Sequence, residues 1–385
     1  MTSDPHVYSK HNSFGGFRGH AADDSGLTLA KIAVALDQPN NSKQLTTYFQ
    51  YILESVKTDL FTSGSLDRPR FGLTPHAAKE IDLLAERDIA RYLVHRYRYE
   101  IHPQLHALDE FPPYLQIEPT SICNYRCVFC YQTDNSFTRR SKDFMGHMTL
   151  ETFMNLIDQA ESNIEFISLA SRGEPMLCKD INSTLAYTRG KFLNLKLNTN
   201  ASVLDEEKAH AILQSGVNTL VFSADAAEEP LYSQLRVNGS PEKVLGNIGR
   251  FQKIRETQYS QVKIITRVSG VRVRAEQDLE GMVSYWGGLV DQVAFVDYVP
   301  WENVYDATYT NIATPCSDLW RRMFVWWDGR VNPCDVDYRS TLTAGLLAGS
   351  KLKDLWRSEA YEALRSRHAG NLRSAVSPCN RCVVV

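Results

Sequence analysis

Short strand-like runs and helical segments alternate along the chain from Tyr114 onward, and this alternation limits the possible folds more than any other feature. The strand-like runs are YLQIEPT, IEFISLAS, FLNLKLNTN, VNTLVFSAD, VKIITRVSG and DQVAFVDYV. Segments between them, such as LETFMNLIDQAES and LDEEKAHAILQSG, carry apolar residues at helical spacing. Repeated strand–helix–strand units predict parallel strands joined by right-handed crossovers. The sequence therefore predicts an α/β fold in which six units form a partial (β/α)6 TIM-like barrel, short of a closed eightfold one.

The composition is that of a soluble globular protein. With 385 residues, of which 43% are hydrophobic and 23% charged, the chain can form one large domain and a smaller appendage. The formal net charge of −3 argues against a nucleic-acid partner, and no apolar run reaches the ~18 residues of a membrane span. Residues 1–26 lack the apolar stretch of a secretory signal, so we expect a cytoplasmic protein.

Ahead of the barrel the sequence indicates a tail and a helical extension. Residues 1–26 are polar and rich in Gly, Ser and His, which predicts a disordered tail. Residues 27–61 predict two helices separated by DQPNNS, and residues 75–100 predict a third, more charged helix. This N-terminal extension, residues 27–112, contains no motif with a recognisable chemistry. We expect it to pack against the main domain, residues 113–300.

After residue 300 the sequence pattern changes again. Two aromatic-rich runs, CSDLWRRMFVWWDGRVNPC and LKDLWRSEAYEALRSRH, are followed by PCNRC. This pattern predicts a small second domain, residues 301–385, made of a hairpin and a helix and held together by cysteines.

Three of the eight cysteines, Cys123, Cys127 and Cys130, lie within the eight residues CNYRCVFC. They directly follow the first predicted strand, and ligands of parallel α/β sheets bind at the carboxyl ends of the strands. In a reducing cytoplasm, clustered cysteines are more often metal ligands than disulfides. Structural zinc needs four ligands, whereas three thiolates can hold a [4Fe–4S] cluster that leaves one iron open. A zinc site with a remote ligand, a redox pair and a chance group of buried thiols are the alternatives.

At these cysteines the chain resembles the radical S-adenosylmethionine (radical SAM) enzymes, and the resemblance covers roughly residues 113–382. It implies that the open iron binds the amino and carboxylate groups of SAM, and that one electron from the cluster cleaves the sulfonium. The resulting 5'-deoxyadenosyl radical would abstract a hydrogen atom from the substrate, while the protein supplies orientation. The resemblance also implies an electron donor such as flavodoxin or ferredoxin, and activity only under anaerobic, reducing conditions.

Further residues match family positions that contact SAM. Phe129 matches the aromatic residue that packs on the adenine. SRGEP, after the second strand, resembles the Gly-Gly-Glu-Pro turn, in which Gly173 and Glu174 would meet the SAM amino group. Arg172 stands where the first glycine is usual, which is a departure from the family pattern.

Polar residues at the ends of later strands complete the expected SAM site. NTN ends the third strand and SAD ends the fourth, so Asn200 and Ser223 are placed to reach ribose hydroxyls. Arg236, in LYSQLRVNG, resembles the family arginine that binds the SAM carboxylate, for which a guanidinium fork is suited. The sequence assigns no catalytic residue.

Four further cysteines occur in the C-terminal region. The spacing Cys316, twelve residues, Gly329, four residues, Cys334 resembles the opening motif of SPASM and twitch domains, and Cys379 and Cys382 form a C-x2-C pair. Four thiolates suffice for one fully ligated [4Fe–4S] cluster, whereas the full SPASM pattern has more cysteines and two clusters. We therefore expect a SPASM/twitch-type domain with one auxiliary cluster. A structural zinc site is the alternative.

Three residues near these motifs have less specific patterns. Cys178 is expected to be a buried, inert thiol, with hydrogen-atom donation to a product radical as the alternative. Asp335 and Asp337 lie beside Cys334. We expect solvated surface carboxylates there, rather than groups that contact a substrate.

The resemblance leaves the substrate open. Enzymes with one auxiliary cluster of this kind include some that oxidise, epimerise or dehydrate sugars and aminocyclitols, and others that modify ribosomally made peptides. The run FSADAAEEPLYSQLRVNGSPEKVLGNIGRF resembles members from carbohydrate and secondary-metabolite pathways, so we expect a small-molecule substrate. A ribosomal-peptide maturase and a non-enzymatic metal-binding protein are the alternatives.

Overall fold

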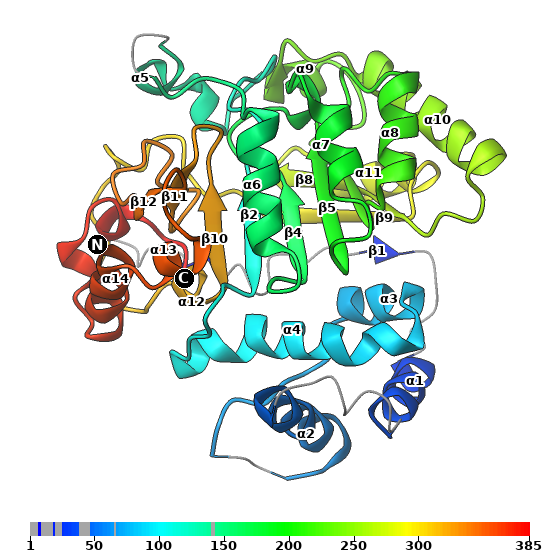
Figure 1. Cartoon of the computed structure of the whole chain (residues 1–385). Coiled ribbons are helices and arrows are strands. Elements are labelled where there is room, and N and C mark those ends of the chain that lie inside the picture. Colours follow the sequence, from blue (N-terminus) through cyan, green and yellow to red (C-terminus); the bar gives the residue numbers. More distant parts are fainter. Residues whose placement is uncertain (1–6, 9–17, 20–24, 38–46, 65–66, 140–142) are drawn as a thin grey trace.

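The computed structural model describes residues 7–8, 18–19, 25–37, 47–64, 67–139 and 143–385 (Figure 1). Its helices are α1 (Ser25–Asp37), α2 (Thr47–Phe61), α3 (Pro75–Leu83), α4 (Glu86–Leu105), α5 (Asn135–Thr138), α6 (Leu150–Ala160), α7 (Ile181–Tyr187), α8 (Glu206–Ser215), α9 (Leu231–Leu235), α10 (Pro241–Gln258), α11 (Leu279–Gly287), α12 (Asp318–Arg321), α13 (Leu352–Trp356) and α14 (Glu359–Ala369). Its strands are β1 (Arg18–Gly19), β2 (Tyr114–Ile117), β3 (Arg126–Cys127), β4 (Phe166–Leu169), β5 (Asn194–Thr199), β6 (Thr219–Ser223), β7 (Arg236–Val237), β8 (Ile265–Arg272), β9 (Gln292–Asp297), β10 (Arg322–Val325), β11 (Arg330–Asn332) and β12 (Gly345–Leu346).

One large sheet organises the molecule, with the strand order β1-β9-β8-β6-β5-β4-β2-β10-β11-β12. The strands from β9 to β10 in this order are parallel to one another. Helices α6, α7, α8, α10 and α11 cover one face of these strands and share the main hydrophobic core with them (Figure 1). The predicted α/β fold is confirmed, and each predicted strand-like run overlaps one of the six strands from β2 to β9 of the parallel sheet.

Local sequence signals set where the covering helices begin and end. Thr149, Asp205 and Ser240 precede α6, α8 and α10, and each accepts a hydrogen bond from a backbone N–H of the first turn. Gly216 ends α8 with φ = +84°, a left-handed conformation that favours glycine. These caps fix the first residues of α6, α8 and α10 and the last residue of α8.

The C-terminal region continues the sheet at its other edge. Residues Arg322 to Val325 of β10 pair in parallel with Tyr114 to Ile117 of β2, and β11 and β12 follow in antiparallel order. The sequence predicted a separate small domain with its own hairpin. The hairpin exists, but one of its strands is joined by backbone hydrogen bonds to the first strand of the main domain.

The predicted third helix of the N-terminal extension, residues 75–100, is wrong in detail, because it is two helices. Helix α3 ends at Leu83, and α4 begins at Glu86 and continues to Leu105. Leu84 has an extended backbone, and Lys31 Nζ donates hydrogen bonds to the carbonyls of Ile81 (2.8 Å) and Leu84 (3.1 Å). A tertiary contact from α1 therefore satisfies carbonyls at the end of α3, which periodicity alone does not reveal.

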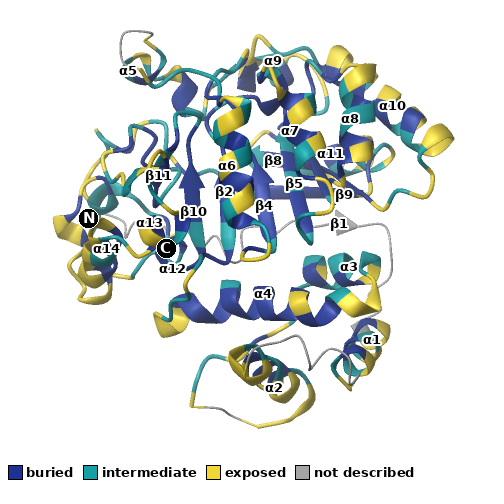
Figure 2. Ribbon diagram, viewed as in Figure 1, coloured by how far each residue is buried: buried dark blue, intermediate teal, exposed yellow. Residues whose placement is uncertain are grey.

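Helix α4 closes the amino-terminal end of the parallel strands. The His95 ring stacks on Phe166, at the start of β4, with 3.6 Å between centroids, and the Tyr99 ring lies 5.8 Å from that of Tyr114, at the start of β2. Figure 1 shows α4 across this end of the sheet, with α1 and α2 beyond it, and Figure 2 shows both the central strands and much of α4 as buried. The expected packing of the extension on the main domain is confirmed.

Most of the predicted tail lies outside the described residues. Of its described parts, Arg18–Gly19 pairs with β9, and Tyr8 bridges to Val384. The prediction of a disordered segment over residues 1–26 therefore stays a prediction. Among the helices of the described ranges, none combines the length and the apolarity that crossing a membrane requires.

Candidate active site

A cavity of about 390 Å³ lies at the carboxyl ends of the parallel strands. All three cysteines of the first motif and all six residues predicted to contact SAM line it: Cys123, Cys127, Cys130, Phe129, Gly173, Glu174, Asn200, Ser223 and Arg236. These residues come from five separate places in the chain, and the parallel topology brings them together.

The cysteine loop is held against Arg236 by backbone pairing. Strands β3 and β7 form a small antiparallel sheet in which Cys127 lies opposite Arg236. Within the loop, Cys130 N donates to the Cys127 carbonyl (3.0 Å), and Arg126 Nη1 donates to the Cys123 carbonyl (2.8 Å). The loop therefore has a fixed conformation beside the arginine.

The three cysteines are half-buried, with their side chains at the wall of the cavity, and this position suits them as ligands. Burial, followed by the charge of Glu174, raises the pKa of Cys123 to about 12, and burial also raises the pKa of Cys130. Neutral thiols are poor nucleophiles, whereas a bound metal stabilises the thiolate. No three His, Cys, Asp or Glu side chains of the described ranges converge on a single ion. A [4Fe–4S] cluster needs no such convergence, because each thiolate binds a different iron.

Glu174 is held in place by three donors. Its carboxylate accepts hydrogen bonds from the Thr199 hydroxyl (2.6 Å), the Asn200 backbone N–H (2.6 Å) and the Met176 backbone N–H (3.1 Å). Burial raises its pKa, and these three bonds oppose the shift. A carboxylate has roughly four acceptor positions, so this fixed group retains capacity for one more donor from the cavity.

The turn before Glu174 is tightly packed. A Cβ on Gly173 would lie 2.3 Å from the Thr120 carbonyl oxygen and 2.7 Å from that of Ile122, so glycine is required there. Ser171 has φ = +132°, a conformation that L-residues rarely adopt. At Gly173 the turn therefore lies directly against the backbone of residues 120–122.

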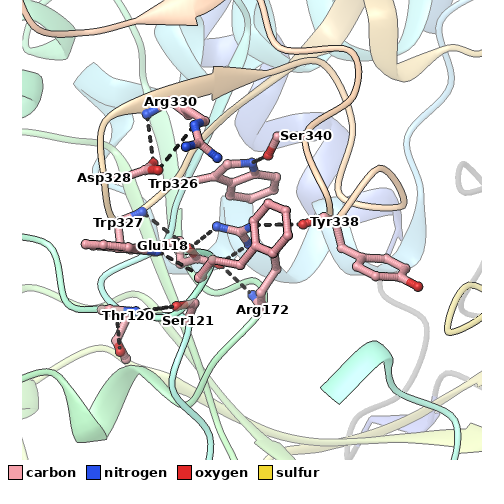
Figure 3. A network of polar contacts seen from close by, with 12 residues as sticks. Glu118, Thr120, Ser121, Arg172, Trp326, Trp327, Asp328, Arg330, Tyr338 and Ser340 are labelled. Carbon is pink, nitrogen blue, oxygen red and sulfur yellow. Dashed lines mark hydrogen bonds and ion pairs between the residues drawn. The ribbon is translucent and has the colours of Figure 1, made fainter. Parts of the chain in front are cut away.

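Arg172, which stands where the family has glycine, directs its guanidinium toward Glu118 and the Tyr338 carbonyl (Figure 3). It forms a bidentate ion pair with Glu118, with Nε–Oε2 and Nη2–Oε1 distances of 2.7 and 2.6 Å, and both side chains are buried. Its Nη1 donates to the Tyr338 carbonyl (2.8 Å), and the guanidinium lies 4.2 Å from the Trp326 ring. Arg172 thus connects the SRGEP turn to the C-terminal region.

Arg236 is fixed by a buried carboxylate. Its Nε lies 2.6 Å from Asp225 Oδ2, and the Val271 backbone N–H donates to Asp225 Oδ1 (2.7 Å). Arg236 Nη1 lies 3.9 Å from Cys127 Sγ, and its guanidinium carbon lies 5.9 Å from the Phe129 ring. The remaining N–H groups of this guanidinium lie beside the cysteines, where an anionic group could be bound.

Of the two strand-end residues, Asn200 has partners within the protein. Its side chain accepts hydrogen bonds from the Ser202 backbone and hydroxyl and donates to Asn124 Oδ1 (3.0 Å). Its amide is thus engaged within the protein, and its backbone N–H supports Glu174. Ser223 ends β6 and lines the cavity as expected.

The four C-terminal cysteines line a second, enclosed cavity: Cys316, Cys334, Cys379 and Cys382. Burial, followed by the charges of Cys316 and Cys382, raises the pKa of Cys379. His368 also lines this cavity, and its Nδ1 accepts a hydrogen bond from the Cys316 backbone N–H (3.2 Å). The grouping of four half-buried cysteines fits the fully ligated cluster expected from the sequence.

The three less specific residues can be placed as well. Asp337 is fully buried and accepts hydrogen bonds from the hydroxyls of Tyr305 (2.6 Å) and Thr341 (2.8 Å), so the expectation of a solvated carboxylate is wrong for it. Asp335 lines the main cavity. Cys178 lies in the main hydrophobic core, as expected for an inert thiol.

Sequence reasoning missed the polar residues deeper in the cavity. Lys196, Asn198 and Gln116 line it from the strand interiors, and Arg322 lines it from β10. The signal was available in NLKLNTN, where Asn, Lys and Asn alternate with apolar or small residues, so one face of the strand is polar. Arg322 could not be found this way, because β10 was not expected in this sheet.

Comparison with known proteins identifies a domain in the parallel-sheet region and another in the C-terminal region. Residues 117–279 match the family described as "Radical SAM superfamily", and residues 316–383 match the SPASM family, described as "Iron-sulfur cluster-binding domain". The GTP 3',8-cyclase 2 of Pseudomonas aeruginosa is 27% identical over 197 residues, which are 49% of this chain and 54% of that protein. The Fe-coproporphyrin III synthase of Methanosarcina barkeri is 30% identical over 110 residues, which are 29% of this chain and 26% of that protein.

The chain thus spans about a quarter to a half of the length of these curated relatives. Among solved structures, Streptococcus suis SuiB bound to its precursor peptide SuiA has the same fold, with a TM-score of 0.53 and 16% identity over 88% of this chain and 82% of that one. Residues 117–279 are thus a radical SAM domain and residues 316–383 a SPASM iron–sulfur cluster-binding domain, and these two domains imply S-adenosylmethionine and [4Fe–4S] clusters as cofactors.

Proposed function

We propose that the chain uses SAM at the Cys123–Cys127–Cys130 site to abstract a hydrogen atom from a small polar molecule, a sugar or an aminocyclitol, in a biosynthetic pathway. The observation that carries this proposal is the single cavity, which has three thiols, Glu174 and Arg236 at one end and polar strand residues at the other. When bound, the cluster and SAM would supply a 5'-deoxyadenosyl radical. The net reaction on the substrate would be an oxidation, an epimerisation or a dehydration.

The protein's own part is to bind and orient. Glu174, fixed by three donors, offers its remaining acceptor capacity to the SAM ammonium group. Arg236, fixed by Asp225, offers N–H groups to the SAM carboxylate. Phe129 provides an apolar face for the adenine, and Ser223 a hydroxyl for the ribose. Because Glu174 and Arg236 are preorganised, little side-chain entropy is lost when SAM binds.

Two features support a small molecule over a peptide. Helix α4 closes the amino-terminal end of the strands. The cavity therefore has a closed end, which we call its floor, opposite the cysteines. In addition, the described residues between Ser25 and Leu105 form helices, without the hairpin strands expected of a leader-peptide-binding domain. An electron donor such as flavodoxin or ferredoxin would act from outside the cavity.

The first test counts iron and product. The protein would be reconstituted anaerobically with iron and sulfide, beside a C123A/C127A/C130A variant. We expect about eight irons per wild-type chain and about four in the variant. We also expect 5'-deoxyadenosine from SAM and dithionite only with the wild type. Two clusters without SAM cleavage, even with candidate substrates present, would contradict the proposal.

The second test separates the substrate classes. Sugars and aminocyclitols deuterated at carbon would be compared with candidate precursor peptides deuterated at the α-carbons. We expect deuterium in 5'-deoxyadenosine with a member of the first group. Transfer from a peptide alone would instead make the chain a peptide maturase. If the second site contained zinc, with about four irons per chain in total, the metal of the C-terminal domain would have a structural role.

A further inference from the structure

Lys196 lies deep in the cavity, away from the cysteine motif. It belongs to β5, and the strand register places it level with Ser168 of β4, which is level with Gln116 of β2. All three residues line the cavity. Arg322 lines it from β10, in register with Tyr114. The floor therefore carries two cationic side chains beside neutral hydrogen-bonding groups.

The charge around Lys196 is predominantly positive. Among the described residues no acidic side chain forms an ion pair with its Nζ, and no acceptor receives a hydrogen bond from it. Burial, followed by the charges of Arg267 and Arg322, lowers the pKa of Lys196 to about 7, and only Glu80 of α3 opposes this shift. Arg267 donates to a neutral partner, Gln292 Oε1, through Nε (2.9 Å) and Nη2 (2.7 Å).

Arg322 already contacts residues of two helices, Tyr99 of α4 and Asp318 of α12. Its Nε donates to the Tyr99 hydroxyl (2.8 Å) and lies 3.7 Å from Asp318 Oδ1. Asp318 also pairs with Arg321 at 3.0 Å, so one carboxylate faces two guanidinium groups. Asp335 lines the cavity too, and its charge acts on Arg322. Around the floor, four cations (Lys196, Arg267, Arg321 and Arg322) therefore face three carboxylates that act on them (Glu80, Asp318 and Asp335).

We infer that the substrate carries an anionic group, a phosphate or a carboxylate, that binds between Lys196 and Arg322 at the floor of the cavity. Such a group accepts hydrogen bonds from both cations and from Gln116, and it offsets the charge that the protein leaves uncompensated there. This inference rests on the proposed function, because it names the class of small molecule. It directs the search to sugar phosphates and sugar acids rather than neutral sugars.

The test is calorimetric titration of the reconstituted, SAM-saturated full chain, without reductant, with inorganic phosphate and with acetate at pH 8. Because SAM fills the cysteine end, the anion can bind only elsewhere. Two buffers of different ionisation enthalpy would report the protons taken up. We expect one of the two anions to bind with uptake of a proton by Lys196, and its identity distinguishes a phosphate from a carboxylate substrate.

Variants keep the inference falsifiable. K196Q should weaken binding of that anion by at least about tenfold, and K196R should bind it without proton uptake, because arginine stays charged. K243Q, on the exposed face of α10, should match the wild type. If neither anion binds, or if K196Q binds it as the wild type does, the inference is wrong. SAM cleavage by the wild type, measured separately, shows whether the proposed function stands.

Discussion

Replacing Arg172 by methionine tests whether the SRGEP turn depends on its ion pair with Glu118. Both side chains are buried, and Arg172 provides two of the hydrogen bonds to that carboxylate. In R172M the Glu118 carboxylate would retain two backbone donors, the N–H groups of residue 172 (3.1 Å) and Trp327 (3.3 Å), and lose its cation. The substitution keeps an unbranched side chain beside Trp326.

The size of the effect follows from what remains. Removing one partner of a buried ion pair costs about 3–5 kcal/mol, because the other charge stays buried. Two backbone donors still solvate Glu118 in R172M, so we expect a loss near the lower end, about 3 kcal/mol in the free energy of unfolding. Loss of the contact between the guanidinium and the Trp326 ring adds to it.

The assay is urea unfolding under anaerobic conditions, followed by circular dichroism. The double variant E118Q/R172M should recover at least half of the loss, because a neutral amide no longer needs a cation. R87M is the matched control, since Arg87 is largely exposed and its nearest carboxylate, on Asp88, lies 3.9 Å away. A loss below about 1 kcal/mol in R172M, similar to that expected for R87M, would refute the reasoning.

Three further predictions concern SAM binding, measured by calorimetry on the reconstituted protein without reductant. G173A should weaken it at least about tenfold, because the new methyl group displaces the turn that carries Glu174, whereas G246A, with open space around it on α10, should not. D225N should weaken it similarly, because Arg236 loses the buried carboxylate that orients it; unchanged affinity would show that Arg236 is held without this pair. Affinity should fall as the pH is lowered from neutrality, because burial raises the pKa of Glu174 and its protonated form attracts an ammonium group less; an affinity that is constant down to the limit of folding would exclude this role.

Much of the fold follows from local patterns in the sequence. The six strand runs and the helices between them were predictable because each has a clear apolar period, and parallel pairing follows from their alternation. The break between α3 and α4 was not predictable, because Lys31 caps α3 from a distant helix. The pairing of β10 with β2 is likewise a contact between residues far apart in sequence, which no local pattern encodes.

The candidate site, too, was predictable from the sequence only in part. Motif spacing located the two cysteine sets and the Glu174 turn, and the topology explains why they meet. The true partners of Asn200 and Arg172 depend on side-chain contacts across the fold, so the sequence could not assign them. The departure at Arg172 was visible in the sequence, but its reason lies in Glu118 and Tyr338, which are 54 and 166 residues away.

The Arg172 contacts imply that the C-terminal cluster domain supports the SAM site. The Arg172 Nη1 donates to the carbonyl of Tyr338, four residues after Cys334. A fixed backbone around Cys334 therefore stabilises the turn that carries Glu174. In C379S/C382S, iron content should fall by about four atoms, and SAM affinity should fall several-fold although the first cluster remains. C178A, in the core outside both cavities, should change neither quantity. If the affinity stays constant while the iron is lost, the turn is held by the main domain alone, and the ion pair with Glu118 is sufficient to fix it.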